Sequence, residues 1–211
     1  MLHGTQGPPR FGSSDVQAAR TLPGIGSGID LIRESASLDD LLEPLRASLG
    51  ADFEGYRGHL YRALTYAMHF LGGDREHRAF IEAALVYHDI GLWTDGDLAY
   101  LEPSIDRALA ANTANSWNFD TELLHDTIHA HHKLTPFRGP GAEVVNAVRR
   151  ADWIDATGGR RRMGLSKAQV KAVTDSVPEA GFSDAVNRLV VDLGGSKMRG
   201  HARVLRHVYK L

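Results

Sequence analysis

The sequence contains no cysteine among its 211 residues. This absence excludes disulfides, iron–sulfur clusters, thiolate zinc sites and cysteine nucleophiles. Any metal ion would therefore have to be bound by imidazole and carboxylate groups. Histidine, by contrast, occurs 11 times, and imidazole is the commonest metal ligand in proteins.

The sequence also lacks an excess of charge of either sign and any long apolar run. Its 24 Lys and Arg residues against 26 Asp and Glu residues give no general attraction to nucleic acid or to anionic membranes. Apolar runs such as 83–87 are far too short to span a bilayer, and no secretory signal is recognisable. We therefore expect a cytoplasmic protein without a nucleic-acid or membrane partner.

The alternating pattern of β-strands is missing as well. Residues 1–28 contain six Gly and three Pro without apolar periodicity, which is typical of a flexible leader. From Ser37 onward, apolar residues recur with helical spacing, and Gly or Pro separates the segments. The sequence thus predicts an all-α fold, with a single helical domain over residues 29–211.

Helices are expected over 37–49, 53–71, 76–90, 103–113, 120–132, 141–156, 166–177, 183–193 and 201–209. The segments within 160–211 are expected to pack on the same core as the others. Their apolar stripes, for example Val186, Leu189, Val190 and Leu193, are interpreted as core residues.

Four of the histidines lie close together, within residues 125–132. His125, His129 and His132 follow the spacing i, i+4, i+7, which places them on one face of a helix. Imidazoles at this spacing can converge on one cation, but they can equally form an ordinary solvated polar face. His131 is expected to point elsewhere.

A second chemical signal is the pair His88-Asp89 at the end of the apolar segment 76–90. A charged carboxylate at the end of a buried helix is costly unless it is paired or coordinated. The segment 83–91 resembles the signature of the HD-domain superfamily of metal-dependent phosphohydrolases. The resemblance covers about residues 55–157 and implies an HD-type helical domain.

The resemblance also implies a set of four metal ligands: His59, His88, Asp89 and Asp152. His59 begins a helical pattern well before the His-Asp pair, and Asp152 lies in the sequence Ala-Asp-Trp-Ile-Asp of residues 151–155. Two imidazoles and two carboxylates suit one divalent transition metal, such as Mn, Fe, Ni or Zn.

A second metal ion is not favoured, because the intervening histidines lie in one segment, whereas two-metal members of the superfamily carry them on two. His125, His129 and His132 could still hold a second ion or contact a substrate phosphate. The expected activity is hydrolysis of a small phosphorylated substrate, such as a nucleotide or phosphate ester, by a metal-bound water.

Further site residues are expected near these ligands. The candidates for the general acid or base are Asp95, Asp97 and Glu102, with Asp126 and Asp155 as alternatives. The expected contacts with the substrate phosphate are Lys133, Arg149 and Arg150, because phosphate esters are anionic.

Two other interpretations stay open, because fold resemblance alone does not fix the reaction. The superfamily includes di-iron oxygenases and a branch that hydrates small nitriles. HD-like domains also act as non-catalytic ligand-sensing modules with degenerate metal sites. The basic loop 160–162 favours an anionic substrate, and four intact ligand positions favour an enzyme.

Overall fold

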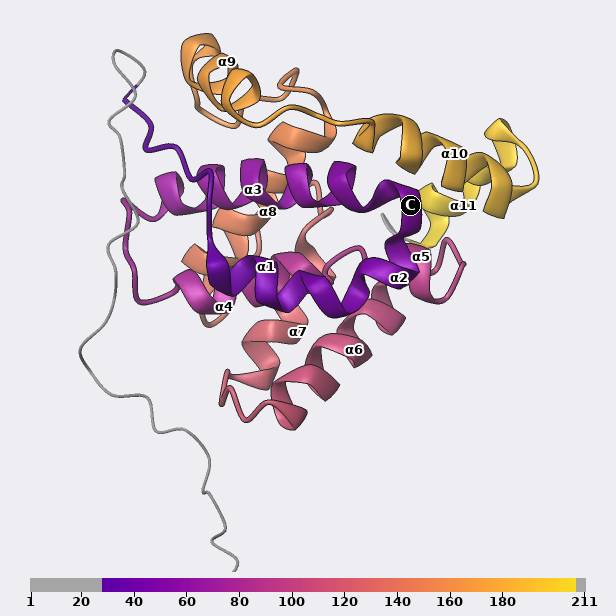
Figure 1. Cartoon of the computed structure of the whole chain (residues 1–211), viewed down its shortest axis with the longest axis horizontal. Helices are drawn as coiled ribbons and strands as arrows, with labels where there is room; N and C mark the ends of the chain where they lie inside the picture. Colours follow the sequence, from indigo (N-terminus) through magenta and orange to yellow (C-terminus); the bar gives the residue numbers. More distant parts are fainter. Residues whose placement is uncertain (1–27, 208–211) are drawn as a thin grey trace, which may run out of the picture.

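The structure, a computed structural model, describes residues 28–207. All but the last residue of the predicted leader 1–28 therefore lies outside the described residues, as do residues 208–211. The described residues form helices and no strand, which confirms the predicted all-α class (Figure 1).

The α-helices are α1 (Ala36–Leu42), α2 (Arg46–Leu49), α3 (Phe53–Phe70), α4 (Arg78–Tyr87), α5 (Gly91–Thr94), α6 (Leu101–Ala114), α7 (Thr121–Ala130), α8 (Ala142–Ala156), α9 (Lys167–Ser176), α10 (Phe182–Gly194) and α11 (Lys197–His207). Short 3-10 helices, Glu43–Leu45 and Gly50–Asp52, separate α1 from α2 and α2 from α3. In the described part of the chain, no helix is both long enough and apolar enough to cross a bilayer.

Most predicted helices occur close to their expected positions, and side-chain caps mark the start of two of them. The side chain of Asp120 accepts hydrogen bonds from two backbone amides at the start of α7, and Ser166 forms a reciprocal capping box with Gln169 at the start of α9. The first predicted helix differs, since a 3-10 turn containing Pro44 divides it into α1 and α2.

The largest difference concerns the end of α4. The helix ends at Tyr87, so His88 and Asp89 lie in the turn that follows it. A short helix, α5, then begins at Gly91, in a segment for which the sequence predicts no helix. This turn allows two consecutive side chains to point toward one place, which a continuous helix would not permit.

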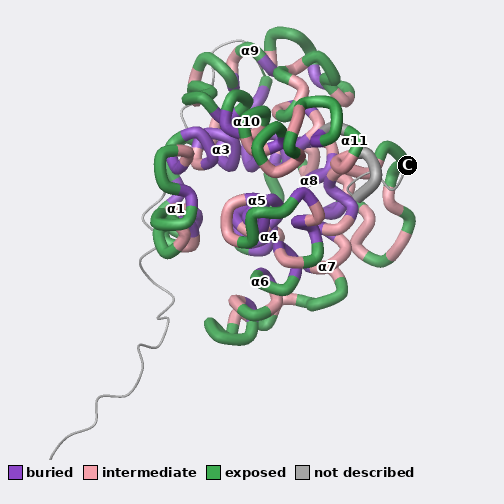
Figure 2. The backbone as a smooth tube through the Cα atoms, turned by 90° about the vertical axis from the view of Figure 1, so that its right-hand side faces the viewer, coloured by how far each residue is buried: buried purple, intermediate pink, exposed green. Residues whose placement is uncertain are grey.

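The core is centred on α3, which packs along α8 and also contacts α4 (Figure 1). Tyr56, Leu60 and Leu64 of α3 are fully buried. Figures 1 and 2 show α9 and α10 on one side of the molecule, next to α3, and α6 and α7 on the other. Purple, buried segments in Figure 2 coincide with α3, α4 and α8, which supply the side chains described below.

The close approach of α5 to α6 requires a glycine at position 91. A Cβ atom there would lie 2.5 Å from the carbonyl oxygen of Tyr100 and 3.0 Å from the hydroxyl of Ser104. We predict that Gly91→Ala lowers the free energy of unfolding by about 1–3 kcal/mol, as overpacking does elsewhere. Chemical denaturation measures this. Ser48→Ala, at an exposed position of α2, is the control; equal stability of the two variants would contradict the close packing.

Candidate metal centre

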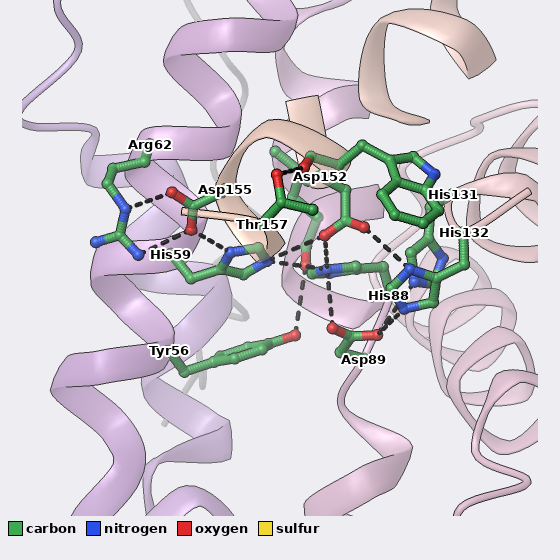
Figure 3. A network of polar contacts seen from close by, with 12 residues as sticks. Tyr56, His59, Arg62, His88, Asp89, His131, His132, Asp152, Asp155 and Thr157 are labelled. Atoms are coloured by element: carbon green, nitrogen blue, oxygen red, sulfur yellow. Dashed lines mark hydrogen bonds and ion pairs between the residues drawn. The ribbon is translucent and has the colours of Figure 1, made fainter. Parts of the chain in front are cut away.

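The structure brings the four predicted ligands together (Figure 3). One ligand atom from each of His59, His88, Asp89 and Asp152 lies within 4.8 Å of the others. His59 comes from α3, the His-Asp pair from the turn after α4, and Asp152 from α8. Each of the four residues is at most 5% exposed. Two carboxylates buried this deeply need positive charge beside them.

The hydrogen bonds of the two histidines determine which ring nitrogen is available. Nδ1 of His59 lies 2.7 Å from a carboxylate oxygen of Asp155, and Nδ1 of His88 lies 2.5 Å from the carbonyl oxygen of Leu85. A carbonyl only accepts hydrogen bonds, and so does an ionised carboxylate; each Nδ1 therefore carries a hydrogen. The Nε2 atom of both rings is left to face the cluster.

These two Nε2 atoms lie 3.1 Å apart. Oδ1 of Asp152 is 3.6 Å from each of them, and Oδ2 of Asp89 is 3.3 Å from that of His88. Two lone pairs at this separation repel each other unless a proton or a cation lies between them. Imidazole and carboxylate donors with this convergence fit a divalent transition metal.

The pKa shifts in the cluster also indicate a place for positive charge. Burial alone would lower the pKa of His88, but the neighbouring Asp89 and Asp152 raise it to about 10. Burial alone would raise the pKa of Asp152, yet His132 and His88 hold it well below its ordinary value. Without metal, His88 therefore keeps a proton at neutral pH, in the place that a cation would take.

A buried ion pair behind His59 fixes the orientation of its ring. Arg62, also on α3, donates from Nε and Nη2 to the two carboxylate oxygens of Asp155, at 2.6 and 2.8 Å. Burial raises the pKa of Asp155, but the hydrogen bonds from His59 and Arg62 outweigh this and lower it. Asp155 thus stays ionised and directs Nε2 of His59 into the cluster.

Asp155 was predicted only as an alternative general acid or base, and Arg62 was not predicted as a site residue. A signal for both existed in the sequence. His59 and Arg62 are spaced i, i+3 on one helix, and Asp152 and Asp155 have the same spacing on another. Two such pairs can face each other when the helices pack side by side, as α3 and α8 do.

A second group of ligand atoms adjoins the first and shares Asp89 with it. It consists of Asp89, His131 and His132. Nδ1 of His131 lies 2.5 Å from the carbonyl oxygen of Ile128, while its Nε2 lies 3.2 Å from Oδ1 of Asp89. Burial and the neighbouring His132 lower the pKa of His131. A neutral ring then turns a lone pair toward a carboxylate oxygen, an arrangement that a cation would stabilise.

Of the three histidines predicted to share a helix face near the metal, only His132 lies at the cluster. Its Nδ1 is 3.1 Å from Oδ2 of Asp152. The rings of His125 and His129 stack on each other elsewhere, and Nδ1 of His125 contacts Asp126. His131, which was expected to point elsewhere, is fully buried against Asp89.

The reason is the register of the buried face of α7. Leu124 and Ile128 form this face, and the spacing i, i+4, i+7 continues it to His131. The face that carries His125 and His129 is partly exposed. Apolar neighbours at helical spacing were therefore a better guide to the buried histidine than the spacing among the histidines themselves.

The acidic residues expected to act as general acid or base are engaged in other contacts. Asp95 pairs with Arg107, Asp97 pairs with Arg203, and the Glu102 carboxylate lies 3.9 Å from Nδ1 of His129. None of the three lines the pocket over the cluster. The inward-facing residues of this segment are apolar or aromatic, with Leu98 and Tyr100 buried.

The three expected cationic contacts do not line that pocket either. Arg149 is 4% exposed and donates to the carbonyl oxygen of Lys133, 3.0 Å away. Arg150 donates to the carbonyl oxygen of Met163 and stacks on the ring of Phe70. Both arginines therefore connect segments of the chain. Arg149 is directed inward because its side of α8 is buried.

A cavity of about 300 Å³ opens onto the cluster. Asp89, Asp152, His132 and Tyr100 lie at its polar end, and the hydroxyl of Tyr100 is 2.8 Å from Nε2 of His132. A larger hollow of about 540 Å³, near Phe70 and Arg150, contains none of the cluster residues. The smaller cavity is therefore the candidate substrate site.

Comparisons of the chain with protein-family models, with curated proteins and with solved structures found no match. The likeness to the HD-domain superfamily therefore depends on the motif residues alone.

The raised pKa of His88 predicts how metal affinity changes with pH. Because a bound metal must displace the His88 proton below pH 10, affinity should rise about tenfold for each pH unit that the solution gains. Calorimetric titration with Mn²⁺ or Zn²⁺ between pH 6 and 8 measures this. An affinity that does not change with pH would contradict the proposed proton displacement.

The hydrogen bond between His59 and Asp155 predicts that a substitution at Asp155 changes metal affinity. Asp155→Asn should weaken metal binding about 10- to 100-fold, because the amide can no longer hold the His59 ring as a carboxylate does. The matched control is Asp175→Asn, since that carboxylate is exposed on α9 and pairs with Lys171. Equal metal content in both variants after dialysis would count against the role of Asp155.

Proposed function

We propose that this chain is a metal-dependent hydrolase of the HD type that cleaves a small phosphate ester. The observation that carries the proposal is the convergence of two imidazole Nε2 atoms and two buried carboxylates, of which the carboxylates of Asp89 and Asp152 line a pocket. His59, His88, Asp89 and Asp152 would hold the metal. A bound divalent ion would polarise the phosphoryl group and lower the pKa of water in the site.

The overall reaction forms a bond between a water oxygen and phosphorus and breaks the bond from phosphorus to the ester oxygen. The water releases protons, and the departing oxygen takes one up. At the polar end of the pocket, the neutral proton carrier is the hydroxyl of Tyr100, which is paired with His132. Asp152 and Asp89 raise the pKa of His132 against the opposing effect of burial. We assign the proton transfer to this pair.

One observation favours a second candidate, a di-iron oxygenase. Asp89 belongs to both groups of ligand atoms, with Oδ2 toward His88 and Oδ1 toward His131. A carboxylate in this position could bridge two metal ions. An oxygenase would take up two irons per chain and consume dioxygen, whereas a hydrolase would release phosphate without consuming dioxygen. A ligand-sensing module would turn over no substrate in either assay.

The hydrolase proposal is tested by loading the protein with Mn²⁺, Fe²⁺, Ni²⁺ or Zn²⁺ and measuring phosphate release from a panel of small esters. We expect turnover that depends on the metal and is lost in Asp152→Asn. Dioxygen uptake without phosphate release would support the oxygenase in its place.

The proton-transfer role makes a separate prediction about Tyr100. Tyr100→Phe should lower kcat about 100-fold while metal content stays unchanged, because general acid–base groups contribute at least this much. The matched control is Tyr66→Phe, since the buried hydroxyl of Tyr66 has no hydrogen-bond partner and lies outside the pocket. If both variants keep full kcat, the proton transfer belongs to another group.

A further inference from the structure

The pocket over the metal cluster is lined by two chemically different sets of side chains. The polar set consists of Asp89, Asp152, His132 and Tyr100. An apolar wall is formed mainly by α10, where Phe182, Val186 and Val190 follow the spacing i, i+4, i+8 and so share one helix face. A substrate bound here would have its reacting group among polar side chains and the rest of its structure against hydrocarbon.

Other helices extend this apolar wall. Leu92 of α5, Val204 of α11 and Ala156 of α8 complete the lining, and the ring of Phe182 stacks on that of His59 with centroids 4.2 Å apart. Val186 and Val190, which were predicted to be core residues, do pack with Leu92 and Tyr100, but they also line the cavity.

The polar groups on the wall are few and are exposed to solvent. Ser183 and Asn187 are exposed residues on the same helix, and among the described lining residues there is no Lys or Arg. A sugar or a base buried against valines would leave hydroxyl or amide groups without partners, at a cost for each group. A chain of phosphates would lack cations along the wall.

The size of the cavity sets a further limit. Its volume of about 300 Å³ lies at the lower end of the range of about 300–1,000 Å³ for small-molecule sites. One phosphoryl group and a compact organic group would fill it.

From these observations we infer that the substrate is a phosphate monoester of a compact apolar alcohol or phenol, and not a nucleotide or sugar phosphate. This inference rests on the proposed hydrolase function and names its substrate class. The wall formed by Phe182, Val186 and Val190 would bind the apolar group, while the cluster binds the phosphoryl group.

Binding and turnover test the inference separately. Metal-loaded protein is titrated calorimetrically with phenylphosphonate and with ribose 5-phosphate, and kcat/KM is measured for phenyl phosphate and for ribose 5-phosphate. We expect at least tenfold tighter binding of phenylphosphonate and at least a tenfold higher kcat/KM for phenyl phosphate, in line with the discrimination of apolar pockets.

A variant on the wall shows whether α10 causes the preference. Val186→Trp should fill the cavity and weaken phenylphosphonate binding about tenfold or more, with metal content unchanged. The matched control is Val191→Trp, because Val191 is exposed on the same helix and does not line the cavity. Circular dichroism and metal analysis of both variants verify that the fold and the cluster are intact.

The outcomes distinguish the two levels of the proposal. Equal or tighter binding of ribose 5-phosphate, or a Val186→Trp protein that binds phenylphosphonate like the control, would overturn the inference about substrate class and leave the hydrolase proposal standing. Preferential phenylphosphonate binding without hydrolysis of any ester would support the apolar pocket and overturn the hydrolase proposal. Failure to bind either probe would overturn the substrate class.

Discussion

Two imidazole Nε2 atoms face each other at 3.1 Å inside the protein, and the helices around them pack so as to keep them there. Both rings have their other nitrogen engaged, His59 with Asp155 and His88 with a backbone carbonyl, so neither can turn its lone pair away without breaking a buried hydrogen bond. The fold must hold them there through the packing of α3, α4 and α8. Two carboxylates beside them make the region a place for positive charge, either a proton on His88 or a metal ion.

Different helices contribute side chains to the cluster and to the cavity. On the metal side, α3 and α8 contribute paired residues one turn apart: His59 and Arg62 on one helix, Asp152 and Asp155 on the other. The ion pair of Arg62 with Asp155 is buried and connects the two helices behind the ligands. Beside the cluster, the side chains of α10 that line the cavity are apolar or uncharged. Asp89 lies where these parts meet and belongs to both groups of ligand atoms.

Much of this arrangement could be predicted from the sequence, because the signals involved are local. Helix periodicity, with Gly or Pro between the apolar segments, predicted most helices, and the order of the His and Asp motifs predicted four residues that the structure brings together. Long-range packing decided the rest. The orientation of α7 selects His131 over His125 and His129. Arg149 and Arg150 were predicted to contact the substrate, but they donate to backbone carbonyls of other segments. The apolar stripe of α10 resembles any core stripe, and only its position beside the cluster shows that it lines a cavity.

X-ray absorption spectroscopy of the Zn²⁺-loaded protein would show whether His59, His88, Asp89 and Asp152 form a metal site. We expect one tightly bound ion per cluster, with ligand nitrogen and oxygen atoms at about 2.0–2.2 Å. We also expect scattering from two imidazole rings, of which one is lost in His88→Ala. A zinc ion without imidazole scattering, or a spectrum that His88→Ala leaves unchanged, would show that these residues do not bind the metal.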